Sequence, residues 1–442
     1  MKPVRSVISL ALDWVVPNRL MKFAFIDQIV ASGGNFLGVI LLARALGMYE
    51  LGRFTLAWML VEFMATLQFA GIIQPMLNIG PKQAETDSVR YYHAVLAQQL
   101  AAGLLVGLLV GAGVGITGWL LSNPGVSTLA LPLGAAIIAY QLYEFYRRYL
   151  FARGRPGAAL GVDLLRFGLQ LAAILTLPFV WPGATAEAGI WIIAAVSAVA
   201  MTQGARLYGR FEWNAATFHS VLVRHWRFSK WTLPSGLMFW ATTQAFMAIS
   251  GIMLGAAATG ALRAATTITG VMNLLLLSLD NFAPVQASRA LHVGGPAALR
   301  FYIGRLTILS VGLMGAAIAV LNIAPDYVVH LLYGEQYEGL GYLVRLLCAP
   351  TAIYGIAAVL VIWAAALERT RLIFWSYAAA TPFSIIGAFL LAEHWGLAGL
   401  VLSSLLVECI RVAVLLVPLL RWSRRDGLQP AQMSPLRDNP AA

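Results

Sequence analysis

Charged side chains are scarce in this chain of 442 residues. Asp, Glu, Lys and Arg together make up 11% of it, whereas hydrophobic residues make up 60%. Soluble domains have about 25% charged residues. A chain this apolar, with a mean hydropathy of +0.77, could not cover its own surface with polar groups. The composition excludes an ordinary soluble protein and indicates that lipid is the main solvent.

Cysteine is equally rare, since Cys348 and Cys409 are the only two. They lie far apart within apolar runs, so neither a disulfide framework nor a thiolate metal site is indicated. We interpret both as small apolar side chains of helices. The N-terminal stretch contains Lys2, Arg5 and Asp13 and lacks a small-residue cleavage site, so we expect no cleavable signal peptide.

Catalytic motifs are also missing. The sequence has no Walker loop, dinucleotide fingerprint or HExxH motif, and its six histidines are scattered. No loop between the apolar runs is long enough for a soluble catalytic domain. An integral-membrane glycosyltransferase or polymerase would need a sizeable outer loop with catalytic acids or arginines, so it is the less favoured alternative. We predict that the protein is not an enzyme and has no catalytic residue, metal or organic cofactor.

Long apolar runs dominate the rest of the sequence. A helix needs about 20 mainly apolar residues to cross a bilayer, and the chain offers twelve such runs. The predicted fold class is therefore an all-α integral membrane protein. We expect spans at 23–45, 52–74, 92–120, 128–150, 158–180, 188–209, 230–253, 261–284, 300–323, 341–366, 371–392 and 396–420.

The loop charges alternate between the two sides of these spans. All but six of the 30 Lys and Arg residues lie near the termini, in every second loop or at adjoining helix ends. The positive-inside rule places this basic side in the cytoplasm. We therefore expect both termini there, in the bacterial inner membrane, and the net charge of +11 requires no nucleic-acid partner. The charged residues of the intervening loops are all acidic: Glu50, Glu187, Asp326, Glu335, Glu338 and Glu393.

A repeat divides the chain into halves. A shift of 208 residues lays Gly47 on Gly255 and Gly52 on Gly260. Each half then has six spans of the same orientation, and parallel repeats of this kind are a transporter architecture. We predict a cytoplasmic interfacial helix over 1–21, an N-terminal six-helix lobe over 22–209, an interfacial linker helix over 210–229, a C-terminal six-helix lobe over 230–421 and a disordered cytoplasmic tail over 422–442.

Six arginines lie within or beside the spans, away from the basic loops. An Arg at a span centre costs about 2.5–3.5 kcal/mol on insertion scales, so it usually faces protein or water. Arg166 lies one helical turn from Asp163, and Arg411 lies one turn from Glu408, which predicts two self-neutralising pairs. The remaining four lie toward the outer side: Arg44, Arg53, Arg263 and Arg345.

Two interpretations of these four outer arginines stay open. Their side chains either snorkel to the outer headgroups or line an electropositive vestibule between the halves. Guanidinium groups suit phosphate, because their planar fork donates two parallel hydrogen bonds. We take all four as candidate substrate-binding residues, for an anionic substrate.

Three acids are candidates for ion coupling or gating. Glu62 has no basic residue within one turn, so it either pairs with one of the four arginines or binds a coupling H⁺ or Na⁺. Asp27 and Asp280 lie near the cytoplasmic ends of the first and eighth spans. They either gate the inner mouth, by pairing with Lys22 or Arg289, or are solvated helix ends.

One stretch, Asn35–Trp58, contains a recognisable pattern. Its first helix ends in LAR-x-LG over 42–47, and then Gly52 and Phe54 lead the second helix. This stretch resembles the opening of the polysaccharide-biosynthesis flippases, of the O-antigen and exopolysaccharide type. These belong to the multidrug/oligosaccharidyl-lipid/polysaccharide (MOP) exporter superfamily. The stretches Gly260–Pro284 and Leu331–Tyr337 are similar to that family too, and the resemblance runs over essentially the whole chain.

The resemblance implies a V-shaped bundle of two lobes around a central cavity. It implies flipping of an undecaprenyl-pyrophosphate-linked oligosaccharide from the cytoplasmic to the periplasmic leaflet by alternating access, for surface polysaccharide assembly. In related lipid flippases, arginines on helices 1, 2 and 8 meet the pyrophosphate, which corresponds to Arg44, Arg53 and Arg263. The implied partners are the lipid-linked oligosaccharide, membrane lipids, a polysaccharide polymerase and glycosyltransferases.

Two other function classes stay open. A small-molecule or multidrug secondary antiporter of the same superfamily would call for acids in its cavity, whereas the unpaired charge in this sequence is mostly basic. A membrane scaffold without transport would have no accessible cavity. The peptidoglycan-precursor branch of the resembled superfamily has fourteen helices, so the expected twelve argue against it.

Overall fold

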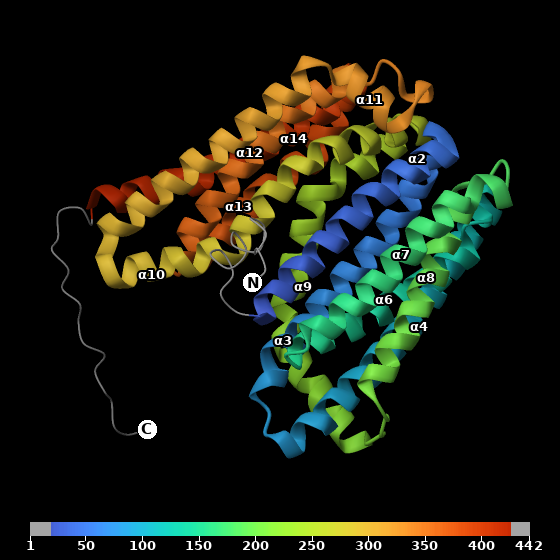
Figure 1. Cartoon of the computed structure of the whole chain (residues 1–442), viewed down its shortest axis with the longest axis horizontal. Helices are drawn as coiled ribbons and strands as arrows, with labels where there is room; N and C mark the ends of the chain where they lie inside the picture. Colours follow the sequence, from blue (N-terminus) through green and yellow to red (C-terminus); the bar gives the residue numbers. More distant parts are fainter. Residues whose placement is uncertain (1–18, 426–442) are drawn as a thin grey trace, which may run out of the picture. The chain divides into compact units, whose positions relative to one another are not determined.

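The computed structural model describes residues 19–425, apart from the side chains of 19–21, 85, 86, 273–282, 285, 424 and 425. Every regular element within these residues is helical, as the sequence predicts (Figure 1). Helices are expected in lipid, because they satisfy all backbone hydrogen bonds within one segment. The expected interfacial helix over 1–21 and the tail over 422–442 lie largely outside the described residues.

Nine helical segments of the described chain are long and apolar enough to cross a membrane. Two of them, Lys22–Lys82 and Thr370–Ser423, each contain two of the expected spans. The eighth expected span forms the first half of α10 (Ala256–Ile323). All twelve expected spans are therefore helical, which confirms the fold class.

Three glycines interrupt the longest helices at the expected span boundaries. Gly47, Gly295 and Gly396 have φ values of 76°, 66° and 55°, which glycine adopts without strain. Figure 1 shows α2 (Arg19–Gln68) reversing direction before the chain reaches α3 (Gln74–Ile79). Single glycines thus turn one continuous helical stretch into a pair of antiparallel spans.

The chain forms two compact units. Unit 1 comprises Met1–Thr267 and Val329–Leu340, and unit 2 comprises Ile268–Val328 and Gly341–Ala442. The lobe boundary predicted at 210–229 rests on the sequence repeat, whereas the two units are defined by compactness. The lobe boundary therefore stays a prediction. Besides α2 and α3, unit 1 contains α4 (Glu85–Leu120), α5 (Pro124–Ser127), α6 (Ala130–Ala152), α7 (Pro156–Val180), α8 (Ala186–Tyr208) and α9 (Ala215–Met253).

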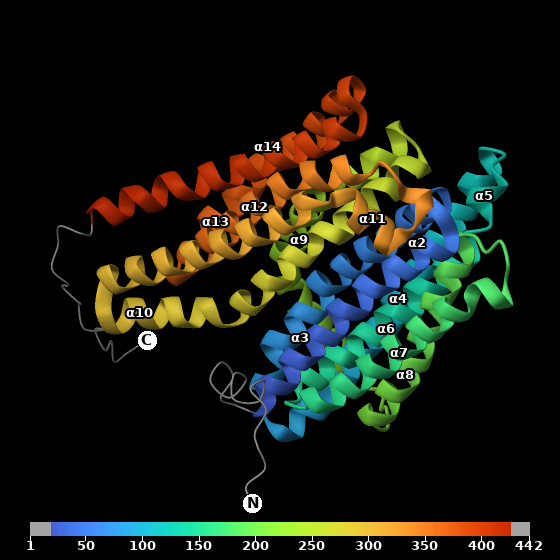
Figure 2. The same ribbon diagram turned by 45° about the horizontal axis from the view of Figure 1, so that its top comes forward.

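Small residues allow close helix packing within unit 1. A Cβ atom added to Gly107 of α4 would lie 2.9 Å from the carbonyl oxygen of Gly134 in α6. One added to Gly111 would lie 3.0 Å from Ala130 O. The two helices lie side by side in Figures 1 and 2. The small-xxx-small spacing in α4 therefore marks a helix–helix contact.

The glycines that open the second and eighth spans touch each other. A Cβ atom on Gly52 would overlap Ala256 O and lie 2.9 Å from Gly260 N. A Cβ atom on Gly260 would overlap Met48 O and lie 3.1 Å from Gly52 N. Since Ala256 and Gly260 are offset by 208 residues from Met48 and Gly52, the contact is reciprocal. It relates the two copies of the repeat by a local two-fold arrangement.

The expected linker helix over 210–229 is not a separate element. Helix α9 begins after Asn214, whose Oδ1 accepts a hydrogen bond from Thr217 N at 2.9 Å, and continues unbroken to Met253. One face of this segment packs on protein, because Ser229 Oγ donates to Gly71 O at 2.9 Å. Gly71 lies in a π-helical turn, Phe69–Ile73, just before Pro75, which has no N–H to donate.

Unit 2 is a smaller helical bundle. Its core is built from aliphatic side chains of α10, α12 and α14 around Trp363. Its elements are the second part of α10, the start of α11 (Pro325–Tyr333), α12 (Gly341–Ala366), α13 (Thr370–Pro382), a π-helical turn (Phe383–Gly387) and α14 (Ala388–Arg425).

Candidate functional site

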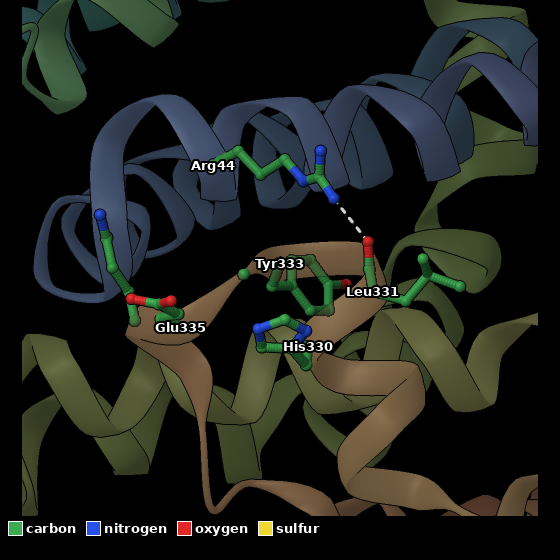
Figure 3. Close-up of a pocket in the computed structure, with 7 residues that line it drawn as sticks. Arg44, His330, Leu331, Tyr333 and Glu335 are labelled. Atoms are coloured by element: carbon green, nitrogen blue, oxygen red, sulfur yellow. Dashed lines mark hydrogen bonds between the residues drawn. The ribbon is translucent and has the colours of Figure 1, made fainter.

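Arg44 lies just before the reversal of α2 at Gly47. The loop charges predict that this reversal faces outward, and we call it the outer end of α2. Its Nε donates to Leu332 O at 2.7 Å, and its Nη2 donates to Leu331 O (Figure 3). These carbonyls belong to the last turn of α11, where helical N–H partners are lacking. A cation at this position also complements the negative end of the helix dipole. Arg44 therefore caps a neighbouring helix.

An open groove of about 570 Å³ lies beside this contact (Figure 3). Most of its lining comes from residues 329–340, a segment of unit 1 that we call the strap. Arg44 is exposed in the groove. The lining residues are Arg44, His330, Leu331, Tyr333, Gly334, Glu335 and Gln336.

Two tyrosines fix the strap to the rest of unit 1. Tyr337 Oη donates to Ala43 O at 3.2 Å, and Tyr333 Oη donates to Ala264 O at 3.0 Å. Their rings lie 5.1 Å apart, and both side chains are buried. The strap thus contacts the outer ends of α2 and α10 together.

Arg263 lies next to this attachment. Burial raises the pKa of Tyr333, while the positive charge of Arg263 acts in the opposite sense. Arg263 immediately precedes Ala264, whose carbonyl accepts the hydrogen bond from Tyr333. Among the described side chains, no carboxylate forms an ion pair with Arg263. The structure brings two predicted residues, Arg44 and Arg263, to the same strap.

Arg53 is engaged in a partly buried ion cluster. Its Nη1 pairs with Glu50 at 2.9 Å, and its Nη2 pairs with Glu187 at 2.7 Å. Nη2 also donates to Gly125 O, while Ala186 N donates to Glu50 at 2.8 Å. These contacts occupy both terminal nitrogens of the guanidinium, and the substrate-binding role of Arg53 stays a prediction. The two loop acids neutralise Arg53 and tie the start of α8 to α2.

Glu62 is bonded within its own helix. Its Oε1 accepts a hydrogen bond from Trp58 Nε1 at 2.8 Å. No arginine among the described side chains pairs with it, and of the two open alternatives the binding of a coupling ion stays a prediction. Trp58 packs edge-on against Tyr140 at 5.2 Å, which sets the carboxylate beside an aromatic cluster.

Asp27 is buried rather than solvated. Its Oδ2 pairs with Arg147 at 2.6 Å, and Arg147 Nε also donates to Asp163 Oδ2 at 2.7 Å. Tyr143 Oη donates to Asp163 Oδ1 at 2.6 Å. Asp27 is 1% exposed and its Oδ1 is buried without a hydrogen-bond partner. The charge pattern of the sequence places Arg147 among the cytoplasmic loop charges, whereas it links α2, α6 and α7 inside unit 1.

Arg166 does not neutralise Asp163 as predicted. Asp163 is occupied by Arg147 and Tyr143, so Arg166 stacks on aromatic rings instead. Its guanidinium lies 4.6, 4.8 and 5.3 Å from the ring centres of Phe167, Tyr143 and Tyr140. Cation–π contacts are strongest where water is excluded, and Arg166 is 2% exposed.

The second predicted pair, in unit 2, is confirmed. Arg411 Nη1 pairs with Glu408 at 2.8 Å, and Arg411 also stacks on Tyr377 at 4.3 Å. Arg345 is exposed on α12, and no described carboxylate forms an ion pair with it. The side chain of Asp280 lies outside the described set.

Comparisons with solved structures identify the fold. The chain is similar to an inward-facing multidrug-resistance MATE family transporter of the MOP superfamily, with a TM-score of 0.70 and 12% identity over 91% of this chain and 96% of that one. It is also similar to the lipid II flippase MurJ in an inward closed conformation, with a TM-score of 0.67 and 12% identity over 89% and 87% of the two chains.

A third similar structure is a MOP superfamily transporter from Pyrococcus furiosus, described by the reverse polarity of its binding pocket. The TM-score is 0.63, with 12% identity over 92% of this chain and 94% of that one. No family model matches the sequence, and no curated protein matches it either. At these identities the likeness defines the fold: this chain has the multi-pass helical fold of MOP superfamily transporters.

Proposed function

We propose that this protein flips an undecaprenyl-pyrophosphate-linked oligosaccharide from the cytoplasmic to the periplasmic leaflet by alternating access. One observation supports this choice of cargo. The acids within the described spans already have partners, whereas three of the four outer arginines, Arg44, Arg263 and Arg345, pair with no carboxylate of the described residues. The remaining charge therefore favours an anion.

The paired acids account for most of the negative charge in the spans. Asp27 and Asp163 share Arg147, and Glu408 pairs with Arg411. Glu144 pairs with Arg148 at 3.3 Å. Glu62 is the remaining acid whose side chain is described in the spans, and Trp58 donates a hydrogen bond to one of its oxygens.

Of the outer arginines, Arg263 and Arg345 form no ion pair with a carboxylate of the described residues, while Arg44 binds backbone carbonyls. Guanidinium groups bind pyrophosphate through paired, charge-assisted hydrogen bonds. We propose Arg263 and Arg345 as the main cargo-binding residues. Arg53, which the sequence predicts to be one of them, is instead proposed to hold the outer helix ends together.

The alternative is a multidrug or small-molecule antiporter. The MATE transporter with the TM-score of 0.70 is described as a multidrug-resistance protein. A cationic drug would require an accessible acid, and Glu62 is the candidate in unit 1. The flippase proposal therefore assigns cargo binding to Arg263, whereas the antiporter proposal assigns it to Glu62.

Coupling to H⁺ or Na⁺ is part of the proposal. Glu62 is the proposed ion-binding acid, because it lies in the second span and pairs with no arginine whose side chain the structure describes. Asp27 and Asp280 are proposed to act at the inner mouth, with Arg147 rather than Lys22 as the partner of Asp27. The proposed setting is the bacterial inner membrane with cytoplasmic termini, beside a polysaccharide polymerase and glycosyltransferases.

Charge removal tests the choice of cargo. Arg263→Gln and Arg345→Gln should each reduce surface-polysaccharide export about tenfold or more, the effect of losing one charge-assisted hydrogen bond. Arg210→Gln is the control, because Arg210 is an exposed residue of a predicted cytoplasmic loop. Normal export by both variants, combined with altered drug resistance, would favour the antiporter.

A further inference from the structure

We propose that the strap is an outer latch. It holds the outer ends of α2 and α10 together and detaches when that end of the molecule opens. The side chains of Arg44, Tyr333 and Tyr337 make the hydrogen bonds that hold the strap in place. This inference assigns Arg44 a conformational role, and it does not depend on which cargo the protein carries.

The path of the chain makes the strap suitable for this role. Residues 329–340 belong to unit 1, whereas the flanking residues 268–328 and 341–442 belong to unit 2. A segment that packs in one unit while both its ends continue into the other must respond to movement between them. Rigid-body movement of two units is a common form of conformational change in proteins.

These hydrogen bonds are all accepted by main-chain carbonyls. Tyr337 binds the carbonyl of Ala43, Tyr333 binds that of Ala264, and Arg44 binds the end of α11 within the strap itself. Gly47 adds a steric fit, since a Cβ atom there would lie 2.8 Å from Gln336 Oε1. Ala43 and Ala264 are 0% and 1% exposed with the strap docked.

Glycines at the strap provide pivots. Gly334 and Gly339 have φ values of 83° and 80°, and neither has a close neighbour at its Cβ position. Just beyond them, Gly341 N donates to Asp326 Oδ1 at 3.0 Å, which fixes the start of α12. Residues that absorb large backbone rotations are typical of hinges. The strap can therefore rotate while α12 keeps its anchorage.

The groove makes the latch releasable. Arg44 is exposed within this open space of about 570 Å³. Water that enters it can replace the hydrogen bonds to Leu331 and Leu332 when the strap lifts. A hydrogen bond exchanged for one to water has a small net free energy, which suits a contact that forms and breaks in each cycle.

Thiol accessibility tests the latch. In a background with Cys348→Ala and Cys409→Ser, single reporters Ala43→Cys and Ala264→Cys are exposed to a membrane-impermeant methanethiosulfonate. Both should react slowly in the parent protein. Adding Arg44→Gln or Tyr337→Phe should raise both rates about tenfold, because each removes a charged or buried hydrogen bond. Arg44→Lys should stay near the parent rate, since it keeps a cationic donor.

The controls separate detachment from unfolding. Ala200→Cys, at a fully buried core position of α8, should stay unreactive in every background. Tyr337→Phe removes one oxygen and keeps the ring, so it retains the packing of the strap. Unchanged rates at both reporters in Arg44→Gln and Tyr337→Phe would overturn the latch. This outcome is independent of cargo, because glycan export is measured separately.

Discussion

Gly52 and Gly260, 208 residues apart, meet backbone to backbone at the openings of two spans. Each would place a Cβ atom against the other's chain, so only hydrogen fits on either side. The sequence shift and the contact are independent observations of the same repeat. Their agreement makes this crossing the firmest point of correspondence between the two copies.

Alanine at this crossing should be destabilising. Gly260→Ala places a methyl group on Met48 O, so the helices must separate, at a cost of about 1–3 kcal/mol for overpacking. Gly270→Ala in the same helix α10 is the control, because nothing lies within 4 Å of its Cβ position. Thermal unfolding in detergent should show a lower Tm for Gly260→Ala alone. Equal Tm values would contradict the contact.

Substitutions of two neighbouring arginines in α6 should lower the free energy of unfolding by very different amounts. Arg147→Gln leaves Asp27 and Asp163 buried without their cation, which costs about 3–5 kcal/mol. Arg148→Gln changes a side chain that is 36% exposed, pairs with Glu144 and lies 5.7 Å from the ring centre of Phe69. Because these contacts are partly solvated, its effect should be below about 1 kcal/mol. Chemical unfolding in mixed micelles compares the two variants. Similar losses would show that the buried network does not exist.

The cluster around Arg53 should behave as one unit. Arg53→Gln and Glu187→Gln should each destabilise the protein, while the double variant should cost clearly less than their sum. The expected coupling is about 1–2 kcal/mol, between the values for exposed and buried pairs. A double-mutant cycle of unfolding free energies measures it. Strict additivity would contradict the ion pair and return Arg53 to the cargo-binding candidates.

Ser229 should stabilise the π-helical turn of Phe69–Ile73. Ser229→Ala leaves the carbonyl of Gly71 without this donor and should cost about 1–2 kcal/mol. Ser220→Ala is the matched control, since that hydroxyl bonds only to Thr217 O of its own helix. The measurement is the Tm of Ser229→Ala compared with that of Ser220→Ala. If both variants unfold at the same temperature, the hydroxyl of Ser229 is not needed there.

Sequence patterns predict those features that depend on neighbouring residues. Apolar length predicts all twelve spans, and Gly47 marks a reversal because glycine alone adopts its φ without strain. The Glu408–Arg411 pair follows from one-turn spacing on a helix. These predictions succeed because helix geometry fixes which side chains are close.

Long-range partners are not predictable in this way. Arg147 lies 120 residues from Asp27, and Arg44 lies 287 residues from Leu331. The local rule pairs Asp163 with Arg166, but it cannot weigh Arg147, a competitor from another helix. Only the folded structure shows which arginine pairs with Asp163. The spacing of Tyr143 and Arg147, one turn apart, is the one local sign that both face the same partner.

Reconstituted transport tests the central claim of an anionic, lipid-linked cargo most directly. Purified protein in proteoliposomes would be given a prenyl-pyrophosphate-linked oligosaccharide, and a membrane-impermeant lectin would measure its transfer between leaflets. The account predicts transfer by the parent protein and the Arg210→Gln control, and its loss in Arg263→Gln. No transfer by the parent protein, together with proton-driven transport of a cationic dye that requires Glu62, would contradict the account.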